Sequence, residues 1–346
     1  MRRHLLAVLM FLTLAGCGEG GSRAPFAESR TPSSIAPRFY APDNWAWGYV
    51  RVGNGPAQRY GVSAPAVGPR ATILILTGYS EPAEKWFETV RRLNEGGYTV
   101  WVLERQGQGG SERLTPWRDV GHVDSFDPDV AAVRALVNVV IRPKSDRPLL
   151  VLGHADGGLV ALLAAESGLP TDGVILSSPA FDLNRPPAQT PQLLVWASRL
   201  KLGWIRPPGA PGWSRDGPDG VVSGLTEDRP RGAIQQAWLT ANPDLRMGAS
   251  SVGWLAAFSS ASERARADVG KVRAPVLLLR GEKDRTAPSA LSTRICAALT
   301  NCREVGFPAG RHDLHMESDA VRDAWLVEIE TFIKARIAAK TERHTG

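Results

Sequence analysis

The chain has 346 residues, of which 43% are hydrophobic and 22% are charged, and its net charge is +6 at pH 7. This is the composition of a globular protein, and the length allows one large α/β domain with an insertion. No block of basic residues interleaves with aromatic residues, so we expect no nucleic-acid partner. After the first residues no apolar run has the length of a membrane-spanning helix, so we expect the body of the protein to be soluble.

The start of the chain has the pattern of a secretory signal. A basic beginning is followed by an apolar run over residues 5–14 and by small residues that lead to Cys17, in the order of a cleaved signal peptide. Residues 14–17 (Leu-Ala-Gly-Cys) closely resemble a bacterial lipobox, in which the cysteine is acylated and becomes the new N-terminus. We therefore predict a lipoprotein signal peptide over residues 1–17, with lipid on Cys17 holding the protein at a membrane surface. A plain signal peptide with an incidental cysteine is the alternative.

The residues after Cys17 indicate where the protein resides and how it is held. Gly18, rather than an aspartate, follows the cysteine. By analogy with lipoprotein sorting this favours the outer membrane, so we expect a lipid-anchored protein of the cell envelope that faces the periplasm. Residues 18–37 are rich in Gly, Ser, Pro and Ala and lack apolar periodicity. They predict a flexible tether between the lipid and the domain.

Residues 38–340 have the alternating pattern of a single α/β domain. Short β-rich runs alternate with helical stretches, which predicts a mostly parallel central sheet flanked by helices. Near-continuous Val, Ile and Leu runs are typical of strands buried on both faces. The predicted strands cover residues 72–76, 99–103, 149–152, 174–176, 275–279 and 303–307, and the predicted helices cover 85–95, 157–166 and 319–338.

A long segment between two of these strands breaks the alternation. Residues 182–265, approximately, contain many Pro and Gly and several tryptophans. Their position predicts a cap inserted over the active site. The tryptophans would line an acyl pocket or, as the simpler interpretation, form a small core of the cap itself. They are Trp196, Trp204, Trp213, Trp238 and Trp254.

Residues 149–158 (Leu-Leu-Val-Leu-Gly-His-Ala-Asp-Gly-Gly) form the sequence of a nucleophile elbow without its nucleophile. In the α/β-hydrolase motif G-x-S-x-G, a serine occupies a sharp turn between a buried strand and a helix. Gly153 and Gly157 are present, because only small residues allow the strand and helix to pass so closely. The central position holds Ala155, whose methyl group cannot attack a carbonyl.

Two later residues stand where the other members of a catalytic triad belong. In α/β-hydrolases the order is nucleophile, acid, histidine; Asp284 follows the penultimate predicted strand and His312 follows the last one. His312 would take the proton from the nucleophile and return it to the leaving group, while Asp284 would fix its tautomer. The oxyanion hole would consist of the backbone N–H groups of Tyr79 and Asp156.

The remaining candidates concern cysteines and metals. Cys296 and Cys302 flank a predicted helix end and the next strand. In an oxidising envelope they form a disulfide, or they remain two partly buried thiols; the spacing allows both. His312 and His315 have an H-x-x-H spacing, but no other His or Cys cluster lies nearby in the sequence. We therefore predict no metal site and no cofactor, and expect His315 to pack or to lie at the surface.

Together these segments resemble the lysophospholipase and monoacylglycerol-lipase-like branch of the α/β-hydrolases, from about residue 38 to the C-terminal helix. The resemblance implies the α/β-hydrolase fold and cleavage of carboxylic esters of lysophospholipids or monoacylglycerols. The fold alone does not distinguish ester from thioester or peptide substrates. The segments that carry the resemblance are Gly78–Glu81, Glu84–Glu88, Glu104–Ser111, Gly121–Phe126, Leu225–Arg229 and Arg311–Glu317.

This chain departs from the family pattern mainly at one position. The family elbow reads G/A-H-S-x-G-G, with serine where Ala155 stands, and the family often has Asp in place of Glu104. Four interpretations of Ala155 remain open. The first is an engineered or erroneous replacement of serine, and the second is a pseudoenzyme that binds an acyl lipid or a protein partner. In the third, Asp156 is the nucleophile, as in dehalogenase-like relatives. In the fourth, a neighbouring serine such as Ser80 or Ser178 takes this role.

Overall fold

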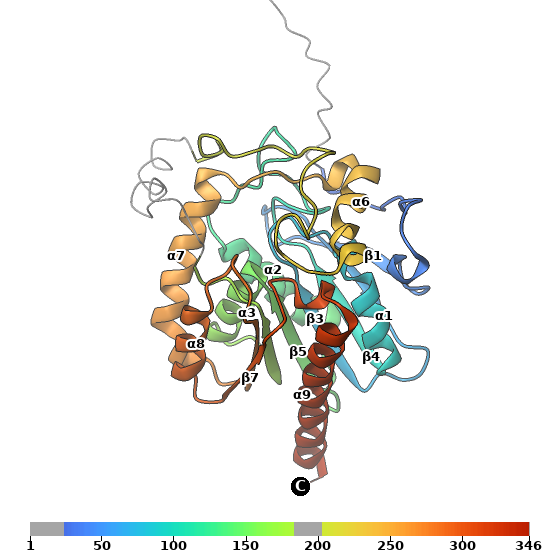
Figure 1. Cartoon of the computed structure of the whole chain (residues 1–346). Helices are drawn as coiled ribbons and strands as arrows, with labels where there is room; N and C mark the ends of the chain where they lie inside the picture. Colours follow the sequence, from blue (N-terminus) through green and yellow to red (C-terminus); the bar gives the residue numbers. More distant parts are fainter. Residues whose placement is uncertain (1–23, 183–202, 346) are drawn as a thin grey trace, which may run out of the picture.

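The computed structural model describes residues 24–182 and 203–345. In these residues the core is one eight-stranded sheet in the order β1-β2-β4-β3-β5-β6-β7-β8 (Figure 1). β2 pairs antiparallel with β1 and β4, and all other neighbours are parallel. The predicted mostly parallel sheet is confirmed, and β1 and β2 add an antiparallel edge. The strands are β1 (Ala46–Val50), β2 (Gln58–Ser63), β3 (Ala71–Leu76), β4 (Tyr98–Leu103), β5 (Leu149–His154), β6 (Gly173–Ser177), β7 (Val276–Gly281) and β8 (Cys302–Phe307).

Helices cover both faces of this sheet, as the apolar runs predict. Ile73 and Ile75 of β3 pack with α1 and α9, whereas the alternate residues Leu74 and Leu76 pack with α2 and α3. Successive side chains of a strand point to opposite faces, so a strand covered on both sides must be apolar throughout. The main helices are α1 (Phe87–Glu95), α2 (Asp127–Ala135), α3 (Asp156–Glu166), α8 (Ser289–Ala298) and α9 (Asp319–Thr345).

Shorter helical turns connect these elements. A π-helical turn, η3, continues α2 and is followed by Arg142, which has φ 48°. The turns are η1 (Pro37–Phe39), η2 (Ala83–Trp86), η3 (Leu136–Ile141), η7 (Val269–Lys271) and η8 (Leu314–Met316).

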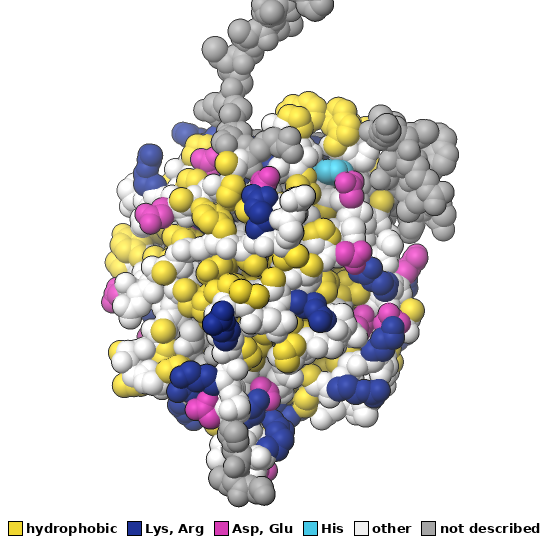
Figure 2. Space-filling model, turned by 180° about the vertical axis from the view of Figure 1, so that it is seen from behind, with side chains coloured by type: hydrophobic (Ala, Val, Ile, Leu, Met, Phe, Trp, Pro, Cys, Tyr) yellow, Lys and Arg dark blue, Asp and Glu magenta, His cyan; other side chains and the backbone are white. Residues whose placement is uncertain are grey.

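On the face shown in Figure 2, Lys and Arg side chains are scattered among Asp and Glu, and no single basic area stands out.

Between β6 and β7, part of the described chain, including α6, lies at the top of Figure 1. The described part of this segment contains α5 (Arg229–Gly232), α6 (Ile234–Ala241), η6 (Pro243–Leu245) and α7 (Val252–Asp268). The predicted cap spans about residues 182–265, and most of α7 falls within those limits. However, α7 packs its buried residues, including Trp254 and Phe258, into the main core rather than into a separate cap core.

The tryptophans of this segment have different environments. Trp238 is 1% exposed and contacts Phe87 edge-on, with ring centroids 5.6 Å apart. Trp204 is 43% exposed and stacks on Trp117. Trp254 is buried beside Tyr79, and Trp196 lies outside the described residues. These tryptophans therefore do not share one role.

Residues 24–37, the described part of the predicted flexible tether, lie against the folded domain. The backbone N–H of Phe26 donates to Gly110 O at 2.7 Å, and the N–H of Arg30 donates to Asn242 Oδ1 at 2.6 Å. Ile35 is buried in a small apolar cluster with α6. Composition predicts flexibility because it reports only local preferences. Here hydrogen bonds to residues distant in the sequence hold the segment.

A disulfide joins Cys296, near the end of α8, to Cys302, the first residue of β8, with Cα atoms 5.4 Å apart. Of the two states that the spacing allows, the structure has the bonded one. Among the described helices, none combines the length and the apolar character needed to cross a membrane. The predicted signal peptide, Cys17 and residues 18–23 lie outside the described residues.

Candidate active site

The strand-to-helix turn after β5 keeps the shape of a nucleophile elbow. Ala155 has φ 49° and ψ −125°, a conformation that costs a residue with a side chain about 1–3 kcal/mol. The neighbouring glycines enforce it. A Cβ on Gly153 would lie 2.5 Å from Gly157 O, and one on Gly157 would lie 2.3 Å from Leu76 O. The backbone therefore still presents residue 155 at the turn, and the group presented is a methyl.

The acid and the histidine lie on the loops that follow the last two strands. His312 Nδ1 donates to Asp284 Oδ2 at 2.7 Å, and both side chains are buried. The backbone N–H groups of Thr286 and Ala287 donate to Asp284 Oδ1 at 2.8 and 3.1 Å, which orients this carboxylate. With Nδ1 engaged, Nε2 is the atom that His312 offers to the adjoining cavity. The geometry is that of the acid–base pair in a catalytic triad.

The protonation of His312 depends on its acidic partner. Burial alone lowers the pKa of the imidazole, but the hydrogen bond and the charge of Asp284 outweigh burial and raise the pKa above its ordinary value. Asp313 and Glu81 act in the same direction. His312 therefore readily holds a proton, as a general base does after it has accepted one.

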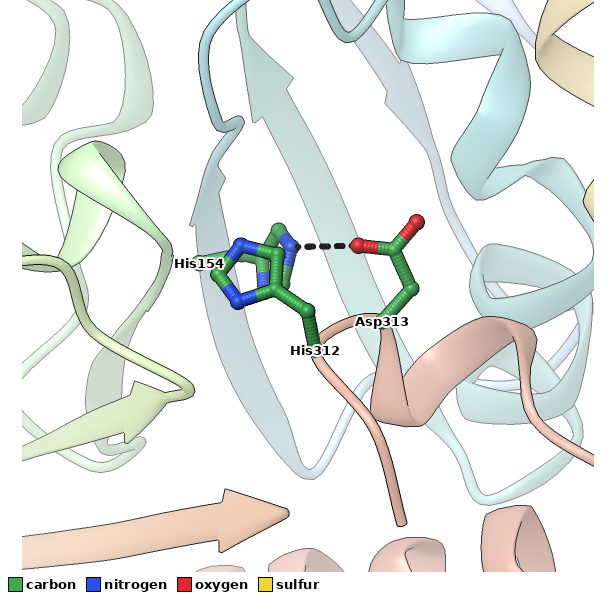
Figure 3. Close-up of side chains that lie close together, drawn as sticks. All are labelled: His154, His312 and Asp313. Atoms are coloured by element: carbon green, nitrogen blue, oxygen red, sulfur yellow. Dashed lines mark hydrogen bonds and ion pairs between the residues drawn. The ribbon is translucent and has the colours of Figure 1, made fainter. Parts of the chain in front are cut away.

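A buried ionic cluster lies directly behind this pair. Lys85 Nζ contacts Asp313 Oδ2 at 2.7 Å and Glu81 Oε1 at 2.5 Å. His154 contacts Asp313 Oδ1 through Nε2 at 3.2 Å (Figure 3) and Ser177 O through Nδ1 at 3.0 Å. Sequence spacing does not identify this cluster, because Glu81 and Lys85 follow β3, His154 ends β5 and Asp313 follows β8.

Lys85 offsets the charge of two buried carboxylates in this cluster. Burial raises the pKa of Glu81, but Lys85 and then His154 lower it more, to about 2. Burial likewise opposes the charged form of Asp313, and Lys85 again dominates and holds its pKa well below the usual range. Both carboxylates are therefore ionised around neutral pH, and Lys85 stabilises the negative charge of both.

Among the described residues, His154, His312 and Asp313 are the group whose potential ligand atoms lie within 4.8 Å of one another. Hydrogen bonds already engage these side chains. Asp313 binds Lys85 and His154, and Nδ1 of His312 binds Asp284. For His315, the sequence predicts a packing or surface position, and the structure has it packed in the interior. His315 is fully buried and stacks on Trp86 with centroids 3.9 Å apart. Burial holds the pKa of this ring well below its ordinary value.

The predicted oxyanion donor Tyr79 N–H has a partner within the protein. It donates to Asp156 Oδ1 at 2.6 Å, and the other oxygen of Asp156 pairs with the guanidinium of Arg105. Asp156 and Arg105 are both 2% exposed. With both of its oxygens engaged, this carboxylate is poorly placed to act as the nucleophile that the sequence leaves open.

The alternative serines also differ in placement. Ser80 lines the cavity next to His312, and its Oγ accepts a hydrogen bond from Gln235 Nε2 at 3.1 Å. Ser178 is 2% exposed and does not line that cavity. Another serine, Ser251, contacts the imidazole of His122 at 2.8 Å. It is fully buried and its Oγ caps α7 by accepting from Trp254 N–H, so it is a structural residue.

A cavity of about 270 Å³ opens at Ala155 and His312. Its apolar wall is formed by Tyr79, Ala180, Leu225 and Trp254. A second cavity of about 340 Å³ extends it beneath the loop of residues 211–220 and α6. The two cavities share five lining residues, which makes them neighbouring chambers: Ser80, Lys85, Leu225, Gln235 and Asp313.

Polar contacts fix the cap segment over these chambers. Tyr79 Oη donates to Gly248 O at 2.9 Å, and Gln235 Nε2 donates to Ser80 O at 3.2 Å. On the other side Arg231 binds Glu88, Asp319 and the backbone oxygen of Glu317. The mouth of the cavity is therefore built jointly by the cap segment and the domain.

Glu104, at the position singled out in the sequence, belongs to a second buried ionic cluster, with Arg59 and Glu84. Glu104 accepts hydrogen bonds from Arg59 Nε at 2.6 Å, from Ala83 N–H at 2.7 Å and from Gly110 N–H at 2.8 Å. Arg59 also binds Glu84 at 2.9 Å. Glu104 therefore organises the turn that precedes the site and does not reach the cavity.

Comparison with known proteins agrees with this architecture. Residues 68–319 match the family described as serine aminopeptidase, S33. Lysophospholipase L2 of Escherichia coli is 26% identical over 286 residues, covering 79% of this chain and 83% of the relative. Monoacylglycerol lipase of Mycolicibacterium smegmatis is 27% identical over 236 residues, covering 67% and 76%.

Solved structures support the fold. A soluble variant of monoglyceride lipase from Saccharomyces cerevisiae aligns with a TM-score of 0.65 at 18% identity, over 84% of this chain and 96% of that chain. A carboxyl esterase from Bacillus coagulans aligns with a TM-score of 0.65 at 17% identity, over 85% and 99%. The predicted α/β-hydrolase fold and the resemblance to lysophospholipases and monoacylglycerol lipases are confirmed. The chain belongs to the serine aminopeptidase S33 family of hydrolases.

Proposed function

We propose that this protein binds a monoacyl ester lipid, of the lysophospholipid or monoacylglycerol class, in the cavity beside His312, without the turnover of a serine hydrolase. The observation that carries the proposal is Ala155 at the elbow. Loss of a triad serine typically lowers kcat by about 10⁶-fold. Binding depends instead on the cavity, which is intact here.

The cavity suits such a ligand in shape and polarity. An apolar wall that includes Trp254 and Leu225 fits an acyl chain, and the neighbouring chamber leaves room for the rest of the molecule. Nε2 of His312 and the Oγ of Ser80 are polar groups at this cavity that can orient an ester or glycerol oxygen. The names of the relatives, lysophospholipase and monoacylglycerol lipase, point to the same ligand class.

The proposed location follows from the N-terminal segment. We propose that Cys17 carries the lipid anchor and that the protein works at the cell envelope, at the outer membrane and facing the periplasm. Monoacyl lipids partition into membranes, so an anchored binding protein meets its ligand at high local concentration.

The first experiment separates binding from turnover. Calorimetric titration of the purified full-length protein with a monoalkylglycerol ether, which an esterase cannot cleave, should give saturable binding. Trp254→Ala should weaken it by about tenfold, because an aromatic wall of the cavity is removed. The matched control Trp117→Ala removes a half-exposed tryptophan that lines neither chamber and should leave the affinity unchanged.

The companion measurement is hydrolysis of a nitrophenyl butyrate and of a 1-monoacylglycerol. We expect no rate above that of His312→Ala. Hydrolysis that His312→Ala abolishes, or covalent labelling by a fluorophosphonate, would show that another nucleophile acts and would overturn the proposal. Absence of ether binding would overturn it as well.

A further inference from the structure

We infer that this chain departs from a working serine hydrolase at two adjacent positions: Asp156 closes the oxyanion hole independently of the missing serine at Ala155. The inference rests on the proposed absence of turnover and deepens it. It assigns to Asp156 the role of a residue that decides whether the site can stabilise a tetrahedral intermediate.

The hydrogen-bond geometry carries the inference. An oxyanion hole works when its N–H groups point to the position that the developing oxyanion will occupy, at roughly 2.7–3.1 Å. The Tyr79 N–H has one proton, and it already donates to Asp156 Oδ1 at 2.6 Å. A carboxylate is a stronger acceptor than an ester carbonyl, so a substrate oxygen would compete poorly for this donor.

The blocking carboxylate is held firmly in place. Arg105 pairs with its second oxygen and also donates to Thr77 O at 3.3 Å, and these groups are almost fully buried. Rotation of Asp156 away from Tyr79 would move its carboxylate from a guanidinium partner that is itself only 2% exposed. The donor is therefore not freed by a simple side-chain rotation.

Charge acts in the same direction as geometry. Arg105 also acts on a second buried carboxylate, Asp129. Burial raises the pKa of Asp129 to about 6, although the charge of Arg105 opposes this rise. The carboxylate of Asp156, which accepts from Tyr79 N–H, lies next to the position of the oxyanion. It therefore disfavours the negative charge that develops on the substrate oxygen in acyl transfer.

Restoring the serine alone should accordingly give little activity. We compare Ala155→Ser with the double variants A155S/D156L and A155S/D156N in the full-length protein. Leucine removes the acceptor, whereas asparagine removes the charge and keeps an oxygen that can accept from Tyr79 N–H. Loss of one oxyanion donor typically costs about 10²–10³-fold in kcat. We therefore expect A155S/D156L to exceed A155S by at least about 100-fold on nitrophenyl butyrate, with A155S/D156N in between.

The matched control is A155S/D129N, which neutralises the other carboxylate beside Arg105 without freeing Tyr79 N–H. It should give no gain over A155S. A circular-dichroism spectrum and a urea midpoint verify folding of each variant. A155S/D156L/R105M, which replaces both members of the buried ion pair by apolar groups, tests the same donor if A155S/D156L is unstable.

The outcomes distinguish this inference from the proposed function. A155S alone within tenfold of the folded A155S/D156L overturns the closed oxyanion hole, even if the unaltered chain binds the ether lipid and does not hydrolyse esters. An unaltered chain that fails to bind the ether overturns the proposed function and leaves the comparison between the serine variants valid. Equal inactivity of all folded serine variants overturns the inference too, because freeing the donor then has no effect.

Discussion

The two halves of the site have diverged to different degrees. The half built by the loops after β7 and β8 keeps an acid–histidine pair with a 2.7 Å hydrogen bond and an orienting network around it. The half built by the elbow and the loop after β3 keeps its backbone shape, but it has a methyl at residue 155 and a carboxylate on Tyr79 N–H. One half has retained groups and geometry, and the other has retained geometry alone.

The difference follows from what else each half does. The charged groups behind His312 are paired with one another in the interior, so removing one of them leaves others unpaired and costs stability. At the elbow the shape is fixed by glycine packing, and the hydroxyl of a serine would add little to that packing. Replacing the nucleophile therefore costs less stability than replacing a charged group on the acid–histidine side of the site.

The strongest test of this comparison is Lys85→Met. Lys85 is the cation shared by Glu81 and Asp313, and its side chain is 4% exposed. Its removal leaves two buried carboxylates without their shared cation and should lower the free energy of unfolding by about 3–5 kcal/mol. Urea denaturation measures the change.

The matched control is Lys283→Met, at a surface pair with Glu227 whose atoms are 3.3 Å apart. Exposed pairs contribute little to stability, so this variant should unfold like the unaltered protein. Similar losses in both variants would contradict a structural role for the buried cluster.

A smaller effect is expected at the elbow itself. Ala155 has φ 49°, which glycine adopts without strain, so Ala155→Gly should stabilise the fold by about 1 kcal/mol. The control Ala161→Gly, in the middle of α3, should destabilise it by about 1 kcal/mol, since glycine is disfavoured inside a helix. Differential scanning calorimetry should therefore show shifts of opposite sign. A destabilised Ala155→Gly would mean that the elbow is not strained.

The smallest effect is a pH dependence from His312. Its folded-state pKa is raised above the unfolded value of about 6.5. The stabilisation is thus complete below pH 6.5 and is lost as the pH rises through the folded pKa. Asp284→Asn removes the charge that raises this pKa, so the unaltered protein should lose more stability than the variant between pH 5.5 and 8.5. Urea midpoints at the two pH values, compared between the proteins, isolate this term, and parallel changes would contradict it.

Much of the architecture follows from the sequence, because long apolar runs identify strands that are buried on both faces. The order of these strands also predicts that Asp284 and His312 follow the last two of them, and the structure brings the pair together. The antiparallel strands β1 and β2 do not have such runs. Their place in the sheet depends on the pairing of β2 with β4, which is remote in the sequence.

The side chain of Asp156 shows where sequence reasoning ends. A motif identifies its backbone N–H as an oxyanion donor, because the position in the elbow fixes the backbone. The direction of its carboxylate depends on Arg105, which follows a different strand and whose position only the folded structure gives. The ordered segment at residues 24–37 is a similar case, since Gly110 and Asn242 hold it from distant parts of the chain.

That N-terminal segment has a mechanical consequence. Phe26 is bonded to the turn at Gly110 on the domain, and Arg30 is bonded to Asn242 beside α6 in the cap segment. An anchor at Cys17 would therefore pull first on a strap fastened to both parts, and tension would be shared between them before it reached the sheet. These two hydrogen bonds would thus oppose separation of the cap segment from the domain when the anchor is pulled.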